Sequence, residues 1–305
     1  MTLRVGTRTS TLARTQTQQV VDALGADAPP VEIVPIVTEG DTNPAALASI
    51  GGAGVFVAAL RTALLDKSID VAVHSYKDLP TAPIDGISIA AVPARQDPRD
   101  ALVARDGLTL GELPPGSRVG TGSPRRAAQL RALGLGLELV PIRGNIDTRL
   151  GKVTSGELDA VVLALAGLRR IDRADAVTEI LDPIQVLPAP AQGALAIEVR
   201  CDDEVATRVV AALDDADTRA AVDAERSLLA ALEAGCSSPV AALAEVVDGE
   251  HGPEIFLRGS VTAIDGSDAV RLSGTGPATD AAAVGRALAA ELLADGADTM
   301  MGSTA

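Results

Sequence analysis

The chain has 305 residues, 47% of them apolar but only 1% aromatic, and a formal net charge of -15. This length favours two or three domains. With so few aromatics, the core must be built from Ala, Val, Leu and Ile, as it is where helices pack on sheets. An acidic chain lacks the broad basic surface that nucleic acids and anionic membranes require, so we expect neither as a partner.

The chain also lacks the patterns of export, membrane insertion and metal binding. Its first residues enter strand-like alternation without a signal-peptide pattern, and no apolar run reaches the roughly 18 residues of a membrane span. Only two cysteines occur, Cys201 and Cys236, and neither has neighbours at metal-ligand spacing. We therefore expect a cytoplasmic protein with reduced thiols and no metal site.

The first stretch alternates as βαβ units do. It predicts a helix from Ser10 to about Leu24, with Ser10 as the N-cap. The Gly-rich segment 40–54 has the length of a lid or binding loop. The other predicted elements are strands at 3–7, 31–37, 70–75 and 87–93 and a helix at 55–66. The charged segment 95–100 is interpreted as a hinge into a second unit.

The second unit repeats this alternation. It predicts strands at 101–104, 118–122, 137–142 and 159–164, and helices at 123–133 and 146–153. The Pro-rich segment 186–193 then returns the chain to a strand at 194–199, so two crossings would place a cleft between two α/β halves. From about residue 215, helices at 216–233 and 278–295 accompany strands at 240–247, 254–262 and 269–275. That order is typical of a small α+β domain.

Basic residues are unevenly chosen, since only Lys67, Lys77 and Lys152 among the 26 are lysines. Arginine binds carboxylates through two parallel hydrogen bonds, so arginine clusters in an acidic protein point to an anionic small ligand. Genome composition would produce the same bias, and composition alone leaves both explanations open.

The densest polar segment is VGTGSPRRAAQL, residues 119–130. A predicted strand ends there and a helix begins, so free N–H groups, the hydroxyls of Thr121 and Ser123, and the Arg125–Arg126 pair could form an anion site. A capped helix start with two solvated arginines fits the same residues. Neither a P-loop lysine nor a GxGxxG pattern is present, so nucleotide phosphate is not indicated.

Two further loops repeat this combination of arginine with a small polar residue. RGNIDTRLGKV (143–153) carries Arg143 and Arg149, and GTRTS near the start carries Arg8 and Ser10. Ligands of open α/β sheets bind at the carboxyl ends of the strands. The three loops therefore predict a site for a polycarboxylate.

A fourth segment, VAVHSYKDLP (71–80), places Ser75, Lys77 and Asp78 directly after a predicted buried strand. An Asp in a loop commonly forms a turn, but a carboxylate facing arginines could accept hydrogen bonds from a ligand and stabilise a developing cation. His74 has no set of His, Asp or Glu partners that would suggest a metal site, and as a single histidine it is equally consistent with a packed core residue. Cys236 follows a helix in the Gly-Ser loop EAGCSSP, whereas Cys201 ends a strand in EVRCDD and is interpreted as structural.

Five segments in this order resemble the porphobilinogen deaminase (hydroxymethylbilane synthase) family: AVHSYKDLP, VGTGSPRR, IRGNIDTRL, LPAPAQGALAIE and LEAGCSSPV. The resemblance covers essentially the whole chain. It implies an α/β fold with two domains related to type 2 periplasmic binding proteins, a cleft between them, and a small C-terminal α+β domain. The implied boundaries are 1–94 with 190–212, 98–187, and 215–305.

The resemblance also implies a transferase of porphyrin and haem biosynthesis. Such an enzyme deaminates four porphobilinogen molecules, condenses them head to tail on a dipyrromethane cofactor, and releases hydroxymethylbilane by hydrolysis. Cys236 matches the cysteine that holds the cofactor through a thioether. Asp78 matches the carboxylate that assists ammonia loss and supports the cationic methylene-pyrrolenine intermediate. A monomer is expected.

The remaining roles follow the family motifs position by position. The residues that match carboxylate-binding positions are Arg8, Ser75, Lys77, Thr121, Ser123, Arg125, Arg126, Arg143, Arg149 and Arg170. Those that match other cleft positions are Gln16, Phe56 and Gln192.

The chain departs from the family pattern in the predicted lid. Ala53 and Ala58 stand where many members carry lysines, and Glu39 replaces a common arginine. No basic substrate contact is therefore expected from this segment. Tyr76 and Pro124 also replace common residues, and neither change is expected to matter for the site.

The principal alternative is a two-lobed binding protein for anionic small molecules with the same fold. It would explain a cleft lined with arginines but would have no use for Cys236 or Asp78. A pyridoxal-phosphate or nucleotide enzyme would need glycine and lysine patterns that the sequence lacks.

Overall fold

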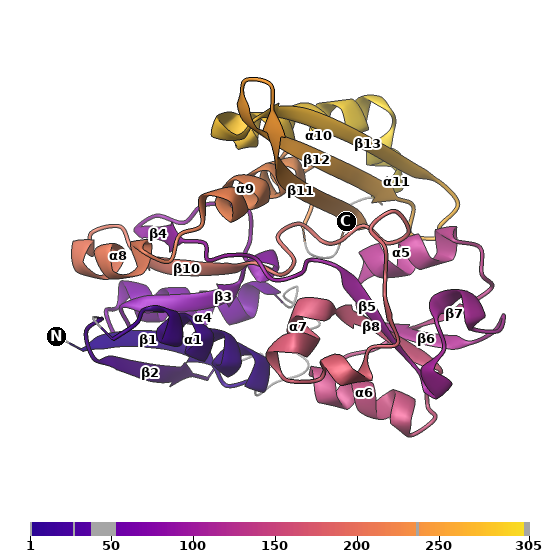
Figure 1. The fold of residues 1–305 in the computed structure, drawn as a ribbon, viewed down its shortest axis with the longest axis horizontal. Coiled ribbons are helices and arrows are strands. Elements are labelled where there is room, and N and C mark those ends of the chain that lie inside the picture. The colour runs from indigo at the N-terminus through magenta and orange to yellow at the C-terminus, as the bar shows by residue number, and fades with distance from the viewer. Residues whose placement is uncertain (1, 27, 38–52, 236–237, 302–305) are drawn as a thin grey trace. The chain divides into compact units, whose positions relative to one another are not determined.

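The computed structural model describes the chain except residues 1, 27, 38–52, 236–237 and 302–305 (Figure 1). By its internal contacts the chain divides into two compact units. One comprises Met1–Gln96 and Ala194–Arg219, and the other Asp97–Gly193 and Ala220–Ala305. The three-domain division implied by the resemblance stays a prediction.

The first unit is built on a five-stranded sheet in the order β2-β1-β3-β10-β4 (Figure 1). Strands β2, β1 and β3 run parallel, and β10 runs antiparallel to β3 and β4. The bounds are β1 Leu3–Arg8, β2 Val31–Ile36, β3 Val71–Ser75, β4 Ile87–Ala91 and β10 Leu195–Arg200.

Helices cover both faces of this sheet, because successive residues of its strands point to opposite sides. Val71 and Val73 of β3 pack in one cluster with α1 (Thr11–Ala23) and α8 (Glu204–Ala211). Ala72, between them, packs with α4 (Ala53–Leu65). Helix α1 begins where the Ser10 hydroxyl accepts the Ala13 N–H at 3.4 Å, so the predicted N-cap is confirmed.

The second unit contains a sheet with the same arrangement, in the order β7-β6-β8-β5-β9. Three parallel strands are again followed by an antiparallel strand, here β5, and a fifth strand. The strands are β5 Asp100–Ala104, β6 Arg118–Thr121, β7 Glu138–Pro141, β8 Ala160–Ala164 and β9 Glu179–Ile180. The helices are α5 Pro124–Ala132, α6 Ile146–Thr154 and α7 Leu165–Arg170. The predicted repetition of the α/β alternation is confirmed.

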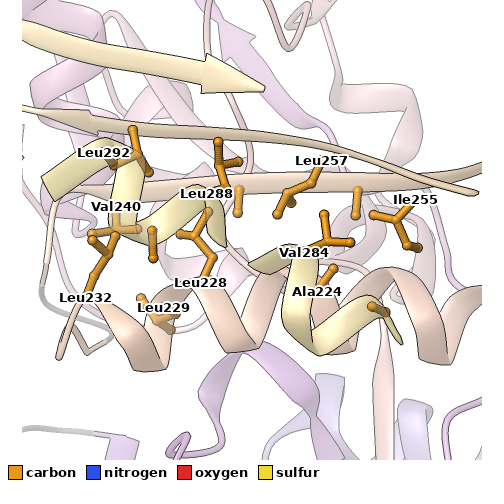
Figure 2. Packing of buried hydrophobic residues seen from close by; sticks show 14 of the residues in the cluster. Ala224, Leu228, Leu229, Leu232, Val240, Ile255, Leu257, Val284, Leu288 and Leu292 are labelled. Atoms are coloured by element: carbon orange, nitrogen blue, oxygen red, sulfur yellow. The ribbon is translucent and has the colours of Figure 1, made fainter. Parts of the chain in front are cut away.

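The rest of the second unit is an antiparallel sheet, β11-β12-β13, packed against helices. Leu228 and Leu288, on different helices, meet Leu257 of the sheet in one apolar cluster (Figure 2). The helices approach closely because Gly285 has no side chain: a Cβ there would lie 2.2 Å from the Ala224 carbonyl oxygen. The bounds are α9 Ala216–Ala231, β11 Val240–Gly249, β12 Gly252–Thr262, β13 Ala269–Pro277, α10 Ala281–Ala294 and α11 Ala297–Met300. The predicted C-terminal α+β arrangement is confirmed.

Candidate functional site: an arginine cluster at the strand ends

The cluster begins at the turn between β6 and α5. The Ser123 hydroxyl accepts the Arg126 N–H at 3.4 Å, and the Thr121 hydroxyl accepts the Ser123 N–H at 3.2 Å. Gly122 stands between them, and a Cβ there would lie 2.6 Å from the Ile142 carbonyl oxygen. Glycine therefore lets this turn approach the loop after β7. The predicted cap is confirmed, with Pro124 in the first helical turn.

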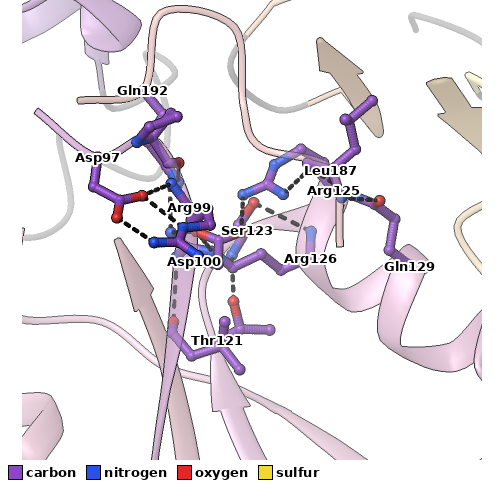
Figure 3. A network of polar contacts seen from close by, with 12 residues as sticks. Asp97, Arg99, Asp100, Thr121, Ser123, Arg125, Arg126, Gln129, Leu187 and Gln192 are labelled. Carbon is purple, nitrogen blue, oxygen red and sulfur yellow. Dashed lines mark hydrogen bonds and ion pairs between the residues drawn. The ribbon is translucent and has the colours of Figure 1, made fainter. Parts of the chain in front are cut away.

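Arg125 and Arg126 are not solvated, so that interpretation of the pair is wrong. Their exposed fractions are 3% and 5%, and both guanidinium groups bind the fully buried carboxylate of Asp100 (Figure 3). Arg125 Nη2 lies 2.8 Å from Asp100 Oδ2, and Arg126 Nη2 lies 2.7 Å from Oδ1. Burial would raise the pKa of Asp100, but the two cations outweigh it and hold that pKa well below its usual value. Two positive charges thus share one negative charge.

Arg170 adds a buried cation at the end of α7. Its Nη2 donates to the Gly193 carbonyl oxygen at 2.8 Å, while its buried Nε has no hydrogen-bond partner. Burial lowers the pKa of Arg170 to about 10, and no carboxylate within the described ranges pairs with it. A buried guanidinium in this state is suited to bind an anion.

Arg149, on α6, is half-buried, and its Nε donates to the Gly144 carbonyl oxygen at 2.8 Å. Burial lowers its pKa, and the nearby charge of Arg126 lowers it further. Repulsion between two arginines is relieved when an anion binds between or beside them. Arg143, in contrast, is exposed.

The segment 186–193 binds to the same cluster. Gln192 donates from Nε2 to Asp100 Oδ1 at 2.8 Å and to the Pro98 carbonyl oxygen at 2.7 Å (Figure 3). Leu187 exchanges two hydrogen bonds with the buried Gln129 side chain on α5. The Glu225 carboxylate, on α9, accepts the N–H groups of Ala191 and Ala244.

Asp100, Gln129 and Glu225 were not predicted from the sequence. Asp100 had one weak signal, a charge placed immediately before the strand predicted at 101–104. The other two lie in helices whose spacing marks them only as polar positions. Their partners come from segments 19 to 58 residues away in the chain, and no local pattern records such pairings.

In the first unit, β1 and β3 run parallel with Val5 opposite Val71, so Arg8 and Ser75 end at the same sheet edge. Gln16 of α1 is buried and donates to the Ser75 hydroxyl at 2.8 Å. Asp78 closes a short 3-10 turn after Ser75 and is half-buried. Its carboxylate has no hydrogen-bond or salt-bridge partner in the part of the chain that the structure describes, which leaves it available to a ligand.

His74 is a packed core residue, which agrees with that interpretation of the sequence. It is buried, and its Nε2 lies 3.2 Å from Glu198 Oε2 on β10. Arg61 binds the same carboxylate at 2.7 Å. Burial raises the pKa of Glu198, but His74 and Arg61 together lower it to about 2.

For several other residues the prediction is either wrong or concerns a part of the chain that the structure does not describe. Cys201 is exposed after β10, so its interpretation as a packed structural residue is wrong. Cys236 and the side chain of Phe56 lie outside the described residues, as do Glu39 and the side chain of Ala53. Lys77 is half-buried beside Asp78.

The second unit therefore brings together Thr121, Ser123, Arg125, Arg126, Arg149, Arg170 and Gln192. The first unit separately brings together Arg8, Gln16, Ser75, Lys77 and Asp78. Over the described residues, no group of His, Cys, Asp and Glu could hold a metal ion, and no helix is both long and apolar enough to cross a bilayer.

The two five-stranded sheets have the same topology, which defines an α/β protein. Each sheet carries polar side chains where its parallel strands end, and such strand ends commonly bind small ligands. Arg125 and Arg126 share one buried carboxylate, and Arg170 lies buried nearby in the same unit, so this cluster is suited to bind an anion. The family follows from the sequence as a whole. Residues 3–208 match the model of the porphobilinogen deaminase dipyrromethane cofactor-binding domain, and residues 219–294 match that of the porphobilinogen deaminase C-terminal domain. The chain belongs to the porphobilinogen deaminase family.

Curated relatives agree over nearly the full length. The porphobilinogen deaminases of Mycobacterium tuberculosis (strain H37Rv) and Mycobacterium bovis (strain BCG / Pasteur 1173P2) are each 60% identical over 304 residues, covering 98% of both chains. A solved nutrient-binding protein from Burkholderia cenocepacia is 13% identical, covers 68% of this chain and 89% of its own, and has a TM-score of 0.42. Family membership confirms the predicted transferase class, its hydroxymethylbilane synthase activity and its dipyrromethane cofactor.

Proposed function

We propose that this chain joins four porphobilinogen molecules into hydroxymethylbilane, with Cys236 holding the dipyrromethane cofactor through a thioether and Asp78 acting at the reacting ring. The observation that carries the proposal is the charge imbalance of the arginine cluster. Arg125 and Arg126 share the carboxylate of Asp100, whereas Arg149 and Arg170 have no carboxylate partner among the described residues. Since the whole chain carries a net charge of -15, this local excess of cations requires a specific anion.

The residues present fit a group that bears acetate and propionate side chains. Arg170 has a buried Nε without a partner, and Arg149 is held near Arg126 with its pKa lowered by burial. Thr121 and Ser123 add hydroxyl donors at the same strand end. These residues would hold the carboxylates of the cofactor and of incoming substrate. When bound, the dipyrromethane group supplies the pyrrole carbon to which the next ring is joined.

Asp78 is suited to act on the ring that loses ammonia. When the C–N bond of the aminomethyl group breaks, its electron pair leaves with ammonia and positive charge develops on the pyrrole. A fixed carboxylate beside the ring stabilises that charge and accepts the pyrrole N–H. Asp78 has no competing partner among the described side chains, and Ser75, which accepts a hydrogen bond from Gln16, directly precedes the 3-10 turn that carries Asp78.

The predicted lid, residues 40–54, lies mostly outside the part of the chain that the structure describes. Ala58, on α4, is exposed and cannot supply a charge to substrate. We propose that carboxylate binding relies on the arginines of the strand ends instead. The cytoplasmic location and the monomeric state remain predictions from the sequence.

The test is the intact mass of the denatured wild-type protein beside that of a Cys236→Ser variant. We expect the wild type to exceed its sequence mass by two coupled pyrrole units, either as purified or after incubation with porphobilinogen, and the variant to show no excess. An equal excess in both proteins would assign the attachment to another residue. A wild type that gains no mass from porphobilinogen would favour the anion-binding protein over the enzyme.

A further inference from the structure

We infer that Asp100 is a positioning residue: it holds the guanidinium groups of Arg125 and Arg126 in the orientation that binds cofactor and substrate carboxylates. This inference rests on the proposed function. Asp100 lies at the start of β5, is fully buried, and belongs to none of the motifs that carry the family resemblance.

Asp100 binds the two arginines through different carboxylate oxygens. Arg126 binds Asp100 Oδ1 through both Nε, at 3.0 Å, and Nη2, at 2.7 Å. Arg125 binds the other oxygen, Oδ2, at 2.8 Å. Each carboxylate oxygen thus fixes one guanidinium plane, because such hydrogen bonds are strongly directional.

Further hydrogen bonds hold Asp100 and the two arginines in place. Gln192 donates to Asp100 Oδ1, and Arg126 Nη1 donates to the Val162 carbonyl oxygen at 3.2 Å. Arg125 Nη1 donates to the Leu187 carbonyl oxygen at 2.5 Å. The carboxylate therefore lies at the centre of a network that joins β5, β8, α5 and the segment 186–193, and its loss would free both arginines at once.

Orientation and charge predict opposite effects on anion binding. If Asp100 only neutralised part of the charge of Arg125 and Arg126, removing its own charge would strengthen anion binding, because the cluster would become more positive. If Asp100 orients the arginines, removing the charge leaves two adjacent cations without a common partner. They would then repel, turn away from each other, and bind anions more weakly.

The experiment compares cofactor loading of apoprotein by porphobilinogen, followed by intact mass, in wild type, Asp100→Asn and Asp100→Glu. Asp70→Asn is the matched control. Asp70 is also buried and also binds two arginines, Arg4 and Arg200, but these belong to no predicted site. Urea midpoints report the stability of every variant.

We expect Asp100→Asn to raise the porphobilinogen concentration that half-saturates loading by about 10- to 100-fold, the ratio expected on losing one charge-assisted hydrogen bond. Asp100→Glu keeps the charge but displaces the carboxylate, and should impair loading in the same direction. It also serves if the Asn variant does not fold. Asp70→Asn should lower the urea midpoint while leaving half-saturation near the wild-type value.

Tighter loading by Asp100→Asn, or wild-type loading by Asp100→Glu, would overturn the positioning role. Equal impairment in Asp70→Asn would assign the effect to general loss of stability and overturn it as well. Failure of the proposed function is distinguishable, because the wild type itself would then gain no mass, and the arginine pair would have no carboxylate ligand to be positioned for.

Discussion

Replacing Arg170 by Met should make the cofactor-free protein more stable, although it removes a buried hydrogen bond. Burial lowers the pKa of Arg170 from 12.5 to about 10. At about 1.4 kcal/mol for each pH unit, holding this charge in the folded chain costs about 3 kcal/mol. Because the disfavoured form is the protonated one, the cost is present in full below about pH 10 and fades only as the pH rises towards 12.5.

Methionine keeps the apolar stem of the side chain but cannot donate to Gly193. The lost hydrogen bond leaves that buried carbonyl oxygen without this donor, which costs about 1 to 2 kcal/mol. The net expectation is a gain of about 1 to 2 kcal/mol for Arg170→Met, or a rise in Tm of roughly 2 to 5 °C. Loading by porphobilinogen should nevertheless slow, because an anion-binding cation has gone.

The assay is thermal unfolding at neutral pH in a Cys236→Ser background, which keeps every protein free of cofactor. The matched control is Arg126→Met, which removes an equally buried arginine that does have a carboxylate partner. It should lose at least about 2 kcal/mol, because Asp100 keeps only one cation. If Arg170→Met loses more than about 1 kcal/mol, Arg170 is a structural residue and the charge argument fails.

Three further changes test other parts of the molecule. Asp78→Asn should leave the cofactor attached, as seen by intact mass, yet abolish most turnover; near-normal product formation would remove Asp78 from its role. The low pKa of Glu198 contributes about 3 kcal/mol of stability that is present above about pH 4.5 and is lost as the pH falls towards 2, so urea unfolding should separate Glu198→Gln from wild type at pH 7 and bring them together in acid. Gly122→Ala should impair loading and cost about 1 to 3 kcal/mol, because its Cβ would meet the Ile142 carbonyl oxygen, whereas Gly111→Ala, whose Cβ would meet nothing within 4 Å, should do neither.

The regular elements could be predicted because hydrophobic periodicity and capping residues are local signals. Ser10 and Ser123 both act as N-caps where they were expected, and each predicted strand has a counterpart displaced by no more than a few residues. Among the α-helices and strands of the described residues, those that were missed are α7, α8, α11 and β9, and the short 3-10 turns were not predicted either. Helix α7, LAGLRR, continues directly from the apolar strand β8, so its first residues resemble more of the strand. Strand β9 has two residues, too few for any period.

The site could be predicted only as a set of residues. The motifs identified Arg125, Arg126 and Arg170, but the sequence says nothing of which cation has an anion beside it. That depends on Asp100, whose partners lie 25 and 26 residues further along the chain, and on helix α7, which the periodicity did not reveal. The interpretation of Arg125 and Arg126 as solvated failed for this reason: a pair at a helix start is exposed unless a strand beside it supplies a counter-ion.

The difference between these arginines bears on how an acidic protein keeps a cationic site. Arg125 and Arg126 are adjacent, so without a shared carboxylate their repulsion would be largest, and Asp100 lowers that cost while leaving the pair with a net positive charge. Arg170 stands alone on α7 and has no such counter-ion within the described residues, so the folded chain bears its desolvation cost in full until a ligand arrives. An anion that reaches all three groups should gain most from Arg170, whose charge no described carboxylate balances, and on the positioning role proposed for Asp100 it would find Arg125 and Arg126 already oriented. Arg170 therefore determines mainly how strongly the anion is attracted, and Asp100 determines how the neighbouring arginines are oriented. The Arg170 and Asp100 variants measure these two properties separately.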